Sequence, residues 1–474
     1  MRVLLLAMPD TADIIDYFGK LPNLGLVNLA GNLPGHDVRV LDLVLYKPRI
    51  RRVLEGILAE FRPQLVGLSA MTFQFDTLIR VARFLRSLDP AVKLAAGGYH
   101  PTLMAREIAA ADPDLPLDFL VRGEGEATFR DLVNALEEPE PDLTRIAGLS
   151  YRQGNSWRHN PDRPLLDLAT LPLPRREARL SQGFFFFDQT MDVVETSRGC
   201  PYDCKFCSIT RMYGRNFRPF PLERILADLE AVRGQGAQAV FFADDNLTFD
   251  IGHFQKLCRA IVDRGLNDLR YATQASAVGL ARNPELVAAM KQANFWMVFV
   301  GFESMSAANL QGMHKPTSPE INRRAAALLR QHDIGIIAGV IFGYPEETRA
   351  SVTRDYRLMK KMRPDLIYSQ YLTPYPKTRL RQEMMAAGLV ANPDDFRTYD
   401  GFHCNIRTHR LSQAALYQSL KRESLKSYFD PSLYVQNFYL RHHPRAFFRA
   451  IARAMLSILA MVLRGGQPAQ RLDI

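Results

Sequence analysis

Three of the chain's five cysteines lie within eight residues, as Cys200, Cys204 and Cys207 in the spacing C-x3-C-x2-C. Three thiolates on one short loop can hold three irons of a [4Fe–4S] cube and leave the fourth iron open. An open iron can bind the amino and carboxylate groups of a methionine moiety and pass an electron to its sulfonium. The alternative is zinc, which usually takes four ligands from paired C-x2-C knuckles, and the sequence has no second knuckle. We therefore predict a cluster with these cysteines as its metal ligands and as the catalytic centre.

The remaining composition indicates a globular intracellular protein. Its 474 residues, 47% of them hydrophobic, suffice for two or three domains. Cys258 and Cys404 stand alone, and we expect both in the core, because the crowding of the other three argues against a disulfide framework. The net charge of +10 is compatible with nucleic acid, an anionic membrane or an anionic cofactor. The first apolar run soon meets Asp10 and does not resemble a secretory signal, so we expect a cytoplasmic protein.

The first 140 residues alternate short apolar runs with amphipathic helical patterns. This alternation predicts a doubly wound, Rossmann-like parallel sheet. Ligands of such sheets bind at the carboxyl ends of the strands, where this sequence carries the small and polar segments 69–72, 97–100 and 122–126. The five strands are expected at 3–6, 38–43, 65–69, 92–96 and 119–121.

A second alternation begins near residue 190 and predicts a partial (β/α)6 TIM barrel. The proline-rich stretch 141–188 is expected as a linker with a small hairpin, 189–380 as the barrel, 381–435 as a helical extension and 436–474 as an amphipathic tail. Catalytic groups of barrels lie at the carboxyl ends of strands, where the cysteines and several acidic residues fall. The six strands are expected at 192–196, 239–243, 270–274, 297–301, 335–342 and 366–372.

The cysteine segment, read with its barrel, resembles the radical S-adenosylmethionine superfamily over about residues 190–380. The resemblance implies that Phe206 packs near the adenine and that Asp244 and Asp245 lie where the methionine amine binds. It also implies that Glu303 and Ser304 contact the ribose and amino acid. Each acidic residue alone would equally fit a helix cap or a surface ion pair. The stretch from Gly339 through Gly343 to Glu346 matches the superfamily's G-x-I-x-G-x-x-E pattern near the adenine, and Lys377 replaces the glycine of its closing T-P-x-P-G-T turn.

The N-terminal sheet resembles the cobalamin-binding domain often attached to this superfamily. Ser69 stands in the place of that domain's S-x-L and Gly97-Gly98 in the place of its G-G, which implies cobalamin contacts at these residues and at Thr72. The D-x-H-x-x-G motif, whose histidine would bind cobalt, is absent from this part of the sequence. Either the lower face of the corrin has no histidine ligand, or the domain has lost its cofactor. His100 is a further candidate contact, although metal-ligand spacing does not support it.

The whole architecture resembles the cobalamin-dependent subfamily of anaerobic magnesium-protoporphyrin ester cyclases and hopanoid methylases, over about residues 1–430. This implies cobalamin-dependent methylation of an unactivated carbon on an apolar lipid, terpenoid or tetrapyrrole, with flavodoxin or ferredoxin as electron donor. The alternative is an oxidative cyclisation or other radical rearrangement without methyl transfer. An RNA-modifying methylthiotransferase would need a second cluster and a β-rich RNA module, so we expect no nucleic acid. A non-catalytic cobalamin sensor would not need the cysteine triplet.

The tail beyond residue 436 mixes aromatic, aliphatic and basic residues. Its uninterrupted apolar part, 454–463, has 10 residues, short of the roughly 20 that span a bilayer. Such a mixture suits a helix lying in the interface of an anionic membrane. We therefore expect peripheral contact with the inner face of the membrane; the alternatives are a helix docked on the barrel and a dimer contact.

Overall fold

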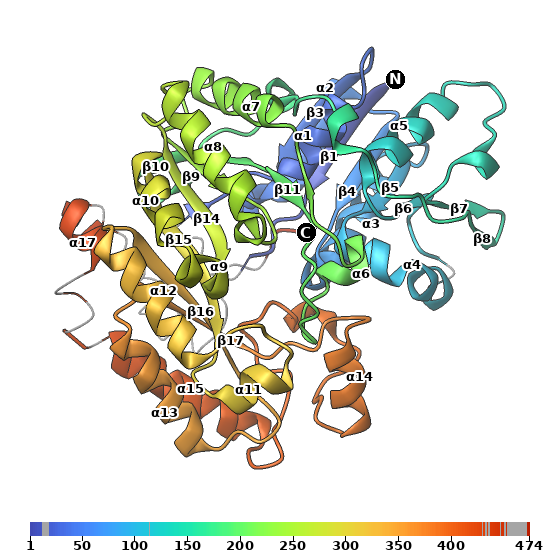
Figure 1. Cartoon of the computed structure of the whole chain (residues 1–474). Coiled ribbons are helices and arrows are strands. Elements are labelled where there is room, and N and C mark those ends of the chain that lie inside the picture. The colour runs from blue at the N-terminus through green and yellow to red at the C-terminus, as the bar shows by residue number, and fades with distance from the viewer. Residues whose placement is uncertain are drawn as a thin grey trace. The chain divides into compact units, whose positions relative to one another are not determined.

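The computed structural model describes residues 1–11, 19–112, 114–428, 430, 431, 434, 437–445, 447–449, 452 and 472–474. The chain divides into two compact units (Figure 1). Unit 1 comprises Met1–Phe184 with Arg453–Ile474, and unit 2 comprises Phe185–Ala452. The stretch expected as a linker, 141–188, therefore belongs largely to unit 1.

Unit 1 is built on a seven-stranded sheet whose first five strands are parallel, as the sequence predicted. The expected hairpin is the antiparallel pair β7–β8, which extends this sheet at the β6 edge. Strand β1 lies between β3 and β4, so the chain changes direction across the sheet at β1, and ligands of open α/β sheets bind at such a point. The order is β3 (Asp37–Asp42), β1 (Arg2–Ala7), β4 (Leu65–Ser69), β5 (Lys93–Gly97), β6 (Phe119–Val121), β7 (Leu149–Gln153) and β8 (Ser156–His159).

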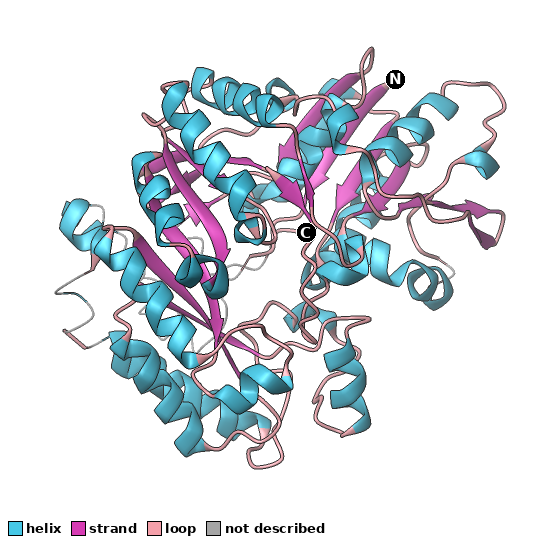
Figure 2. Cartoon of the chain, viewed as in Figure 1, coloured by secondary structure: helices cyan, strands magenta, loops and turns pink. Residues whose placement is uncertain are grey.

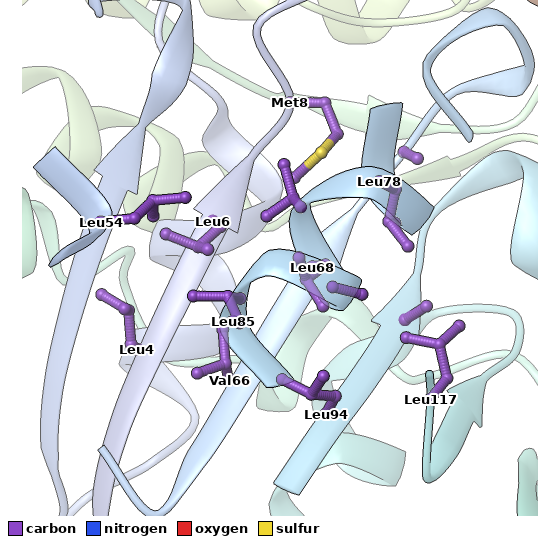
Figure 3. Close-up of a cluster of buried hydrophobic side chains, with 14 of the residues drawn as sticks. Leu4, Leu6, Met8, Leu54, Val66, Leu68, Leu78, Leu85, Leu94 and Leu117 are labelled. Atoms are coloured by element: carbon purple, nitrogen blue, oxygen red, sulfur yellow. The ribbon is translucent and has the colours of Figure 1, made fainter. Parts of the chain in front are cut away.

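The core of unit 1 forms where two amphipathic helices cover the central strands. Leu54 on one helix and Leu78 and Leu85 on the other lie over Leu4 and Leu68 of the sheet (Figure 3). These strands are near-continuous apolar runs because parallel strands are covered on both faces. The helices of the unit are α1 (Leu24–Gly31), α2 (Ile50–Phe61), α3 (Phe75–Leu88), α4 (Tyr99–Ala111) and α5 (Gly125–Ala135).

Unit 2 contains the six parallel strands expected of the partial barrel, and an antiparallel strand β9 pairs with the first of them. The sheet is curled, and helices cover one of its faces (Figure 2). The order in this unit is β17 (Leu366–Tyr371), β16 (Gly335–Phe342), β15 (Phe295–Glu303), β14 (Arg270–Ser276), β13 (Ala239–Phe242), β10 (Gln189–Val194) and β9 (Phe185–Phe186).

The two faces of this curled sheet differ in burial. In β16 Ile336 and Ala338 are fully buried, whereas Ile337 and Ile341, on the opposite face, are partly exposed. We call the second face the inner face. The helices are α6 (Ile209–Tyr213), α7 (Leu222–Gly234), α8 (Ile251–Asp263), α9 (Ala277–Arg282), α10 (Pro284–Gln292), α11 (Ala307–Gly312), α12 (Pro319–Gln331), α13 (Arg349–Lys361), α14 (Arg379–Ala386), α15 (Gln413–Tyr428) and α17 (Phe438–His442).

The apolar tail segment 454–463 lies outside the described residues. Among the residues that are described, no helix is long and apolar enough to cross a membrane. The last three residues return to unit 1, where Leu472 and Ile474 pack against its hydrophobic core and the Ile474 carbonyl accepts a hydrogen bond from Arg80.

Candidate functional site

The cysteine loop begins directly after β10, at the carboxyl end of the first barrel strand. Asp245, which follows the neighbouring strand β13, accepts a hydrogen bond from the Gly199 amide at 2.9 Å. Gly199 has a φ of +86°, and a β-carbon there would lie 2.8 Å from the Asn216 carbonyl oxygen. Glycine is therefore required at the turn that leads into the cysteines.

Asp244 holds the start of the cysteine loop, at Thr196 and Ser197, through hydrogen bonds. Its carboxylate accepts hydrogen bonds from the Thr196 amide, the Thr196 hydroxyl at 2.7 Å and the Ser197 hydroxyl. The side chain is fully buried, and burial raises the pKa of Asp244 to about 7 and that of Asp245 to about 6. Here both aspartates position the loop, and their direct contact with S-adenosylmethionine stays a prediction.

The three cysteines are free thiols with a suitable donor chemistry for a cluster. Cys204 is buried, and Cys200 and Cys207 are partly exposed. Burial raises the pKa of Cys204 to about 11 and that of Cys207 to about 12, so iron must displace the thiol protons when it binds. Asn246 lies with its amide nitrogen 3.7 Å from the Cys200 sulfur. Hydrogen bonds to the sulfurs are one means by which a protein tunes a cluster.

Contacts from later in the chain hold the loop on its other side. The Lys205 amide donates to the Met313 carbonyl, and the Lys205 carbonyl accepts from the Leu380 amide at 3.0 Å. The Lys205 ammonium also pairs with Glu383 of α14 at 2.9 Å. The loop is thus fixed between the segment after α11 and the start of α14, and Phe206 next to it is partly exposed.

A buried ion pair lies at the end of β15. The Glu303 carboxylate and the Lys315 ammonium are 2.7 Å apart, and their side chains are only 12% and 14% exposed. A β-carbon on Gly301 would lie 2.5 Å from the Glu303 oxygen, so this glycine makes room for the pair. Burial lowers the pKa of Lys315, but Glu303 and the nearby Cys204 raise it more, and the net shift is upward. Lys315 could not be predicted from the sequence, because a single lysine in a loop gives no pattern.

The G-x-I-x-G-x-x-E match ends at Glu346, which is the exposed one of two adjacent glutamates, and its position near the adenine stays a prediction. Glu346 is 71% exposed and lies 3.7 Å from His409. Glu347 is buried, accepts a hydrogen bond from the Gly343 amide at 2.6 Å and another from Asn309 at 3.2 Å. Burial raises the pKa of Glu347 to about 8. The glutamate that shapes this strand end is therefore Glu347.

The remaining predicted residues have clear local roles. Ser304 is buried and donates a hydrogen bond to Asp355 at 2.6 Å. Gly339 lies under the ring of Phe299, since a β-carbon there would approach that ring to 2.6 Å. Lys377 adopts a φ of +61°, which explains why the superfamily pattern has glycine at this position.

In unit 1 the predicted cobalamin contacts come together at the ends of two neighbouring strands. Ser69 is paired with Gly97 across β4 and β5, and the Ala70 amide donates to the Gly97 carbonyl at 3.1 Å. Gly98 has a φ of +92°, and a β-carbon there would lie 2.8 Å from the Ala70 carbonyl oxygen. Thr72, which begins the next turn, is buried. The two glycines thus leave bare backbone at the ligand-binding edge, which suits the close approach of a cofactor.

His100 lies behind this edge and is only 3% exposed. Its ring is 4.6 Å from that of Phe75, and its amide donates to the Ala70 carbonyl at 3.3 Å. Burial lowers the pKa of His100 to about 4, so the imidazole is neutral at pH 7. The residue joins α4 to the end of β4, and a contact with cobalamin stays a prediction.

Comparison with known families and proteins agrees with this division of the chain. Residues 11–133 match the B12 binding domain and residues 194–359 the Radical SAM superfamily. An uncharacterized methyltransferase of Pyrococcus horikoshii is 29% identical over 468 residues, covering 97% of this chain and 98% of that protein. The hopanoid C-3 methylase of Methylococcus capsulatus is 28% identical, covering 85% of this chain and 76% of that protein.

The anaerobic magnesium-protoporphyrin IX monomethyl ester cyclase of a Synechocystis species is also 28% identical, covering 79% of this chain and 75% of the cyclase. Among solved structures, the radical S-adenosylmethionine methyltransferase TsrM of Kitasatospora setae, with cobalamin and a [4Fe–4S] cluster bound, superposes with a TM-score of 0.66. The sequence identity is 21%, and the match covers 81% of this chain and 75% of TsrM. The likeness to TsrM confirms the fold.

Proposed function

We infer that this chain is a cobalamin-dependent radical S-adenosylmethionine enzyme, and we propose that it methylates an unactivated carbon of an apolar substrate. One observation carries this conclusion. A barrel whose first strand ends in three cluster-spaced thiols follows, in one chain, a B12-binding sheet with glycines at its ligand edge. Relatives named as methylases of hopanoids and of bacteriochlorophyllide d support methyl transfer.

The residues of unit 2 fit the cluster and S-adenosylmethionine. When bound, the [4Fe–4S] cluster supplies the electron that cleaves S-adenosylmethionine to a 5′-deoxyadenosyl radical, and cobalamin carries the methyl group. Cys200, Cys204 and Cys207 would hold the cluster. Glu303 and Lys315 present one negative and one positive group beside it, which complements the ammonium and carboxylate of an amino acid.

The residues of unit 1 fit cobalamin through backbone rather than through a metal ligand. Ser69, Thr72, Gly97 and Gly98 form the edge at which the cofactor would lie, and a β-carbon at residue 98 would collide with Ala70 and so disturb this edge. The cobalamin-binding part is assigned to residues 1–140, and the radical core to 189–380. Unit 1 extends this first part by the β7–β8 hairpin.

The substrate and partners are proposed on chemical grounds. The inner face of the barrel sheet is lined mainly by apolar side chains, such as Phe299 and Ile337, which suits a lipid, terpenoid or tetrapyrrole. An electron donor of the flavodoxin or ferredoxin class would reduce the cluster. The basic and aromatic residues Arg445, Phe448 and Arg449 support peripheral contact with an anionic membrane, since Phe448 is 62% exposed.

A second candidate is radical chemistry without methyl transfer, such as an oxidative cyclisation. The similarity to magnesium-protoporphyrin ester cyclases, at 28% and 24–25% identity, favours it. Both candidates use the same cluster and differ in whether a methyl group reaches the product.

One experiment separates the two candidates. The protein is purified without oxygen, reconstituted with iron, sulfide and cobalamin, and supplied with S-adenosylmethionine, a reductant and an extract of apolar cell lipids and pigments. We expect S-adenosylhomocysteine and 5′-deoxyadenosine in equal amounts, together with a product heavier by one methylene. Deoxyadenosine with an unmethylated product would favour cyclisation, and protein that binds no iron would exclude both reactions.

A further inference from the structure

Three aromatic rings from three separate segments form a continuous row on unit 2. The rings of Phe299 on β15 and Tyr368 on β17 are 5.5 Å apart at 79°, and those of Tyr368 and Phe402 are 5.1 Å apart at 83°. Edge-to-face contacts at such distances are favourable. All three side chains are partly exposed, so they remain accessible to a ligand. We call these residues the aromatic wall.

The aromatic wall lies on the inner face and begins beside the proposed S-adenosylmethionine site. Gly301 and Gly339 are register partners, as are Gly339 and Tyr368, and paired residues of parallel strands share a face. The ring of Phe299 covers Gly339, while the Glu303–Lys315 pair covers Gly301. The first ring of the wall and the ion pair therefore lie over two paired residues of neighbouring strands.

The third ring is fixed in place although it comes from the helical extension. Asp400 accepts hydrogen bonds from the Phe402 and His403 amides at 2.9 and 3.0 Å. The Gly401 carbonyl accepts from the Tyr371 amide at 2.7 Å, and Gly401 has a φ of +85° with the Gln370 side chain where a β-carbon would stand. A side chain at residue 401 would require the Gln370 side chain to move away from this loop.

The far end of the inner face is closed by α17. Phe438 lies against Gly335 at the start of β16, where a β-carbon would be 3.3 Å from its ring. Tyr439 stacks on Phe187 with ring centroids 3.8 Å apart. Phe438 and Tyr439 belong to a buried cluster, against which Phe187 and Ile337 pack. We call Phe438 and Tyr439 the floor.

Buried polar groups hold the floor to the strand starts. Asp365, before β17, accepts hydrogen bonds from the Phe438 and Ile336 amides, and its carbonyl accepts from Asn437 at 2.8 Å. The Tyr439 hydroxyl donates to Asp188, before β10. The floor is thus part of the folded barrel and not a loosely placed terminus.

The register gives the depth of the enclosed face. From Gly335, beneath the floor contact, to Gly339, beside the ion pair, the chain advances four residues, which is about 13 Å at ~3.3 Å per residue. The side chains of Phe299 and Ile337 occupy part of that depth. A long acyl group in its extended form is longer than this distance between the ion pair and the floor.

From these observations we propose that the aromatic wall binds the hydrophobic body of the substrate and that the floor limits its length, so that together they select a compact ring system over an extended acyl chain. The proposal rests on the proposed function for the reaction that follows binding. Aromatic edges and faces match a flat or fused-ring ligand. A rigid ring also loses less conformational entropy on binding than a flexible chain does.

The test compares two carboxylates of different shape, 1-pyrenebutanoate and palmitate, by equilibrium dialysis against the reconstituted full-length protein. We expect pyrenebutanoate to bind at least about tenfold more tightly, and the Tyr368→Leu/Phe402→Leu variant to lose about tenfold of that affinity. Tyr417→Leu, which replaces an exposed aromatic residue outside the wall, is the matched control and should bind normally. Equal binding of palmitate, or unchanged binding by the double variant, would overturn the proposal.

A second variant tests the floor. Phe438→Ala shortens the barrier, so palmitate should bind several-fold more tightly while pyrenebutanoate changes by less than about twofold. Iron content and far-ultraviolet circular dichroism show whether each variant is folded. Formation of deoxyadenosine and methylated product is scored separately. A ring preference without methyl transfer would therefore overturn the proposed function and leave this proposal standing.

Discussion

Gly98 and Ala70 are in such close contact that a β-carbon on residue 98 would lie 2.8 Å from the Ala70 carbonyl oxygen and 3.1 Å from its nitrogen. The two residues follow the neighbouring strands β5 and β4 at the ligand-binding edge of unit 1. The contact brings together Ser69-Ala70 and Gly97-Gly98, two segments that the sequence linked only through their resemblance to a cobalamin-binding domain.

This contact predicts a strong effect of Gly98→Ala. The free energy of unfolding, measured with urea, should fall by about 2–4 kcal/mol, because the added β-carbon overlaps Ala70 and the φ is unfavourable for alanine. The variant should also retain no cobalamin after gel filtration. Gly35→Ala is the matched control, since Gly35 has a φ of +80° but nothing within 4 Å of the added carbon. It should lose only about 1 kcal/mol and keep cobalamin. Equal losses in the two variants would contradict the role of the contact.

Replacement of any one cluster cysteine should remove the iron. Cys200→Ser, Cys204→Ser and Cys207→Ser each leave a cube with too few thiolates, so iron content should fall to background and deoxyadenosine formation by at least about 100-fold. Iron and sulfide analysis of anaerobic protein gives the readout. Cys404→Ser, far from the triplet in sequence and buried, should keep its full iron content. A triplet variant with wild-type iron would refute the ligand assignment.

The two adjacent glutamates should respond very differently to substitution. Glu347→Ala leaves the Gly343 amide and Asn309 without their buried acceptor, which should lower the free energy of unfolding by about 2–3 kcal/mol and weaken S-adenosylmethionine binding. Glu346→Ala removes an exposed side chain and should change stability by less than about 0.5 kcal/mol. Urea unfolding and equilibrium dialysis measure both effects. A larger loss of stability in the Glu346 variant would contradict the structural role of Glu347.

His100 should make stability depend on pH on the acid side. Its pKa falls from 6.5 to about 4 on folding, mainly through burial, so the unfolded chain binds more protons between these two values. The contribution of His100 to the free energy of unfolding is therefore fully present above pH 6.5. It is lost as the pH falls towards 4, by about 3 kcal/mol in total. Urea midpoints at pH 7 and 5 should differ less in His100→Gln than in the natural protein. Parallel pH profiles would exclude the neutral buried histidine.

The sequence by itself determined the kinds of element and the chemistry of the central loop. Apolar runs such as 65–69, alternating with amphipathic stretches, are sufficient to predict parallel sheets, because burial on both faces demands them. The spacing of Cys200, Cys204 and Cys207 is a local property, so ligand chemistry could be inferred without a fold. Motif order placed Ser69, Gly97 and Gly98 at strand ends, and the register of β4 and β5 confirms that Ser69 and Gly97 are neighbours.

Only the tertiary structure decided which side chains lie together at the strand ends. Whether Glu346 or Glu347 turns inward depends on where β16 ends and on contacts with Asn309. The hydrophobic periodicity of the sequence cannot tell which of two adjacent residues is buried at that point. Lys315 becomes significant only because chain reversal brings its ammonium to Glu303, 12 residues earlier. The aromatic wall and the floor join residues up to 103 and 252 positions apart, Phe299 with Phe402 and Phe187 with Tyr439. Such pairings arise from long-range packing of the whole barrel, and a single sequence gives no local signal for them.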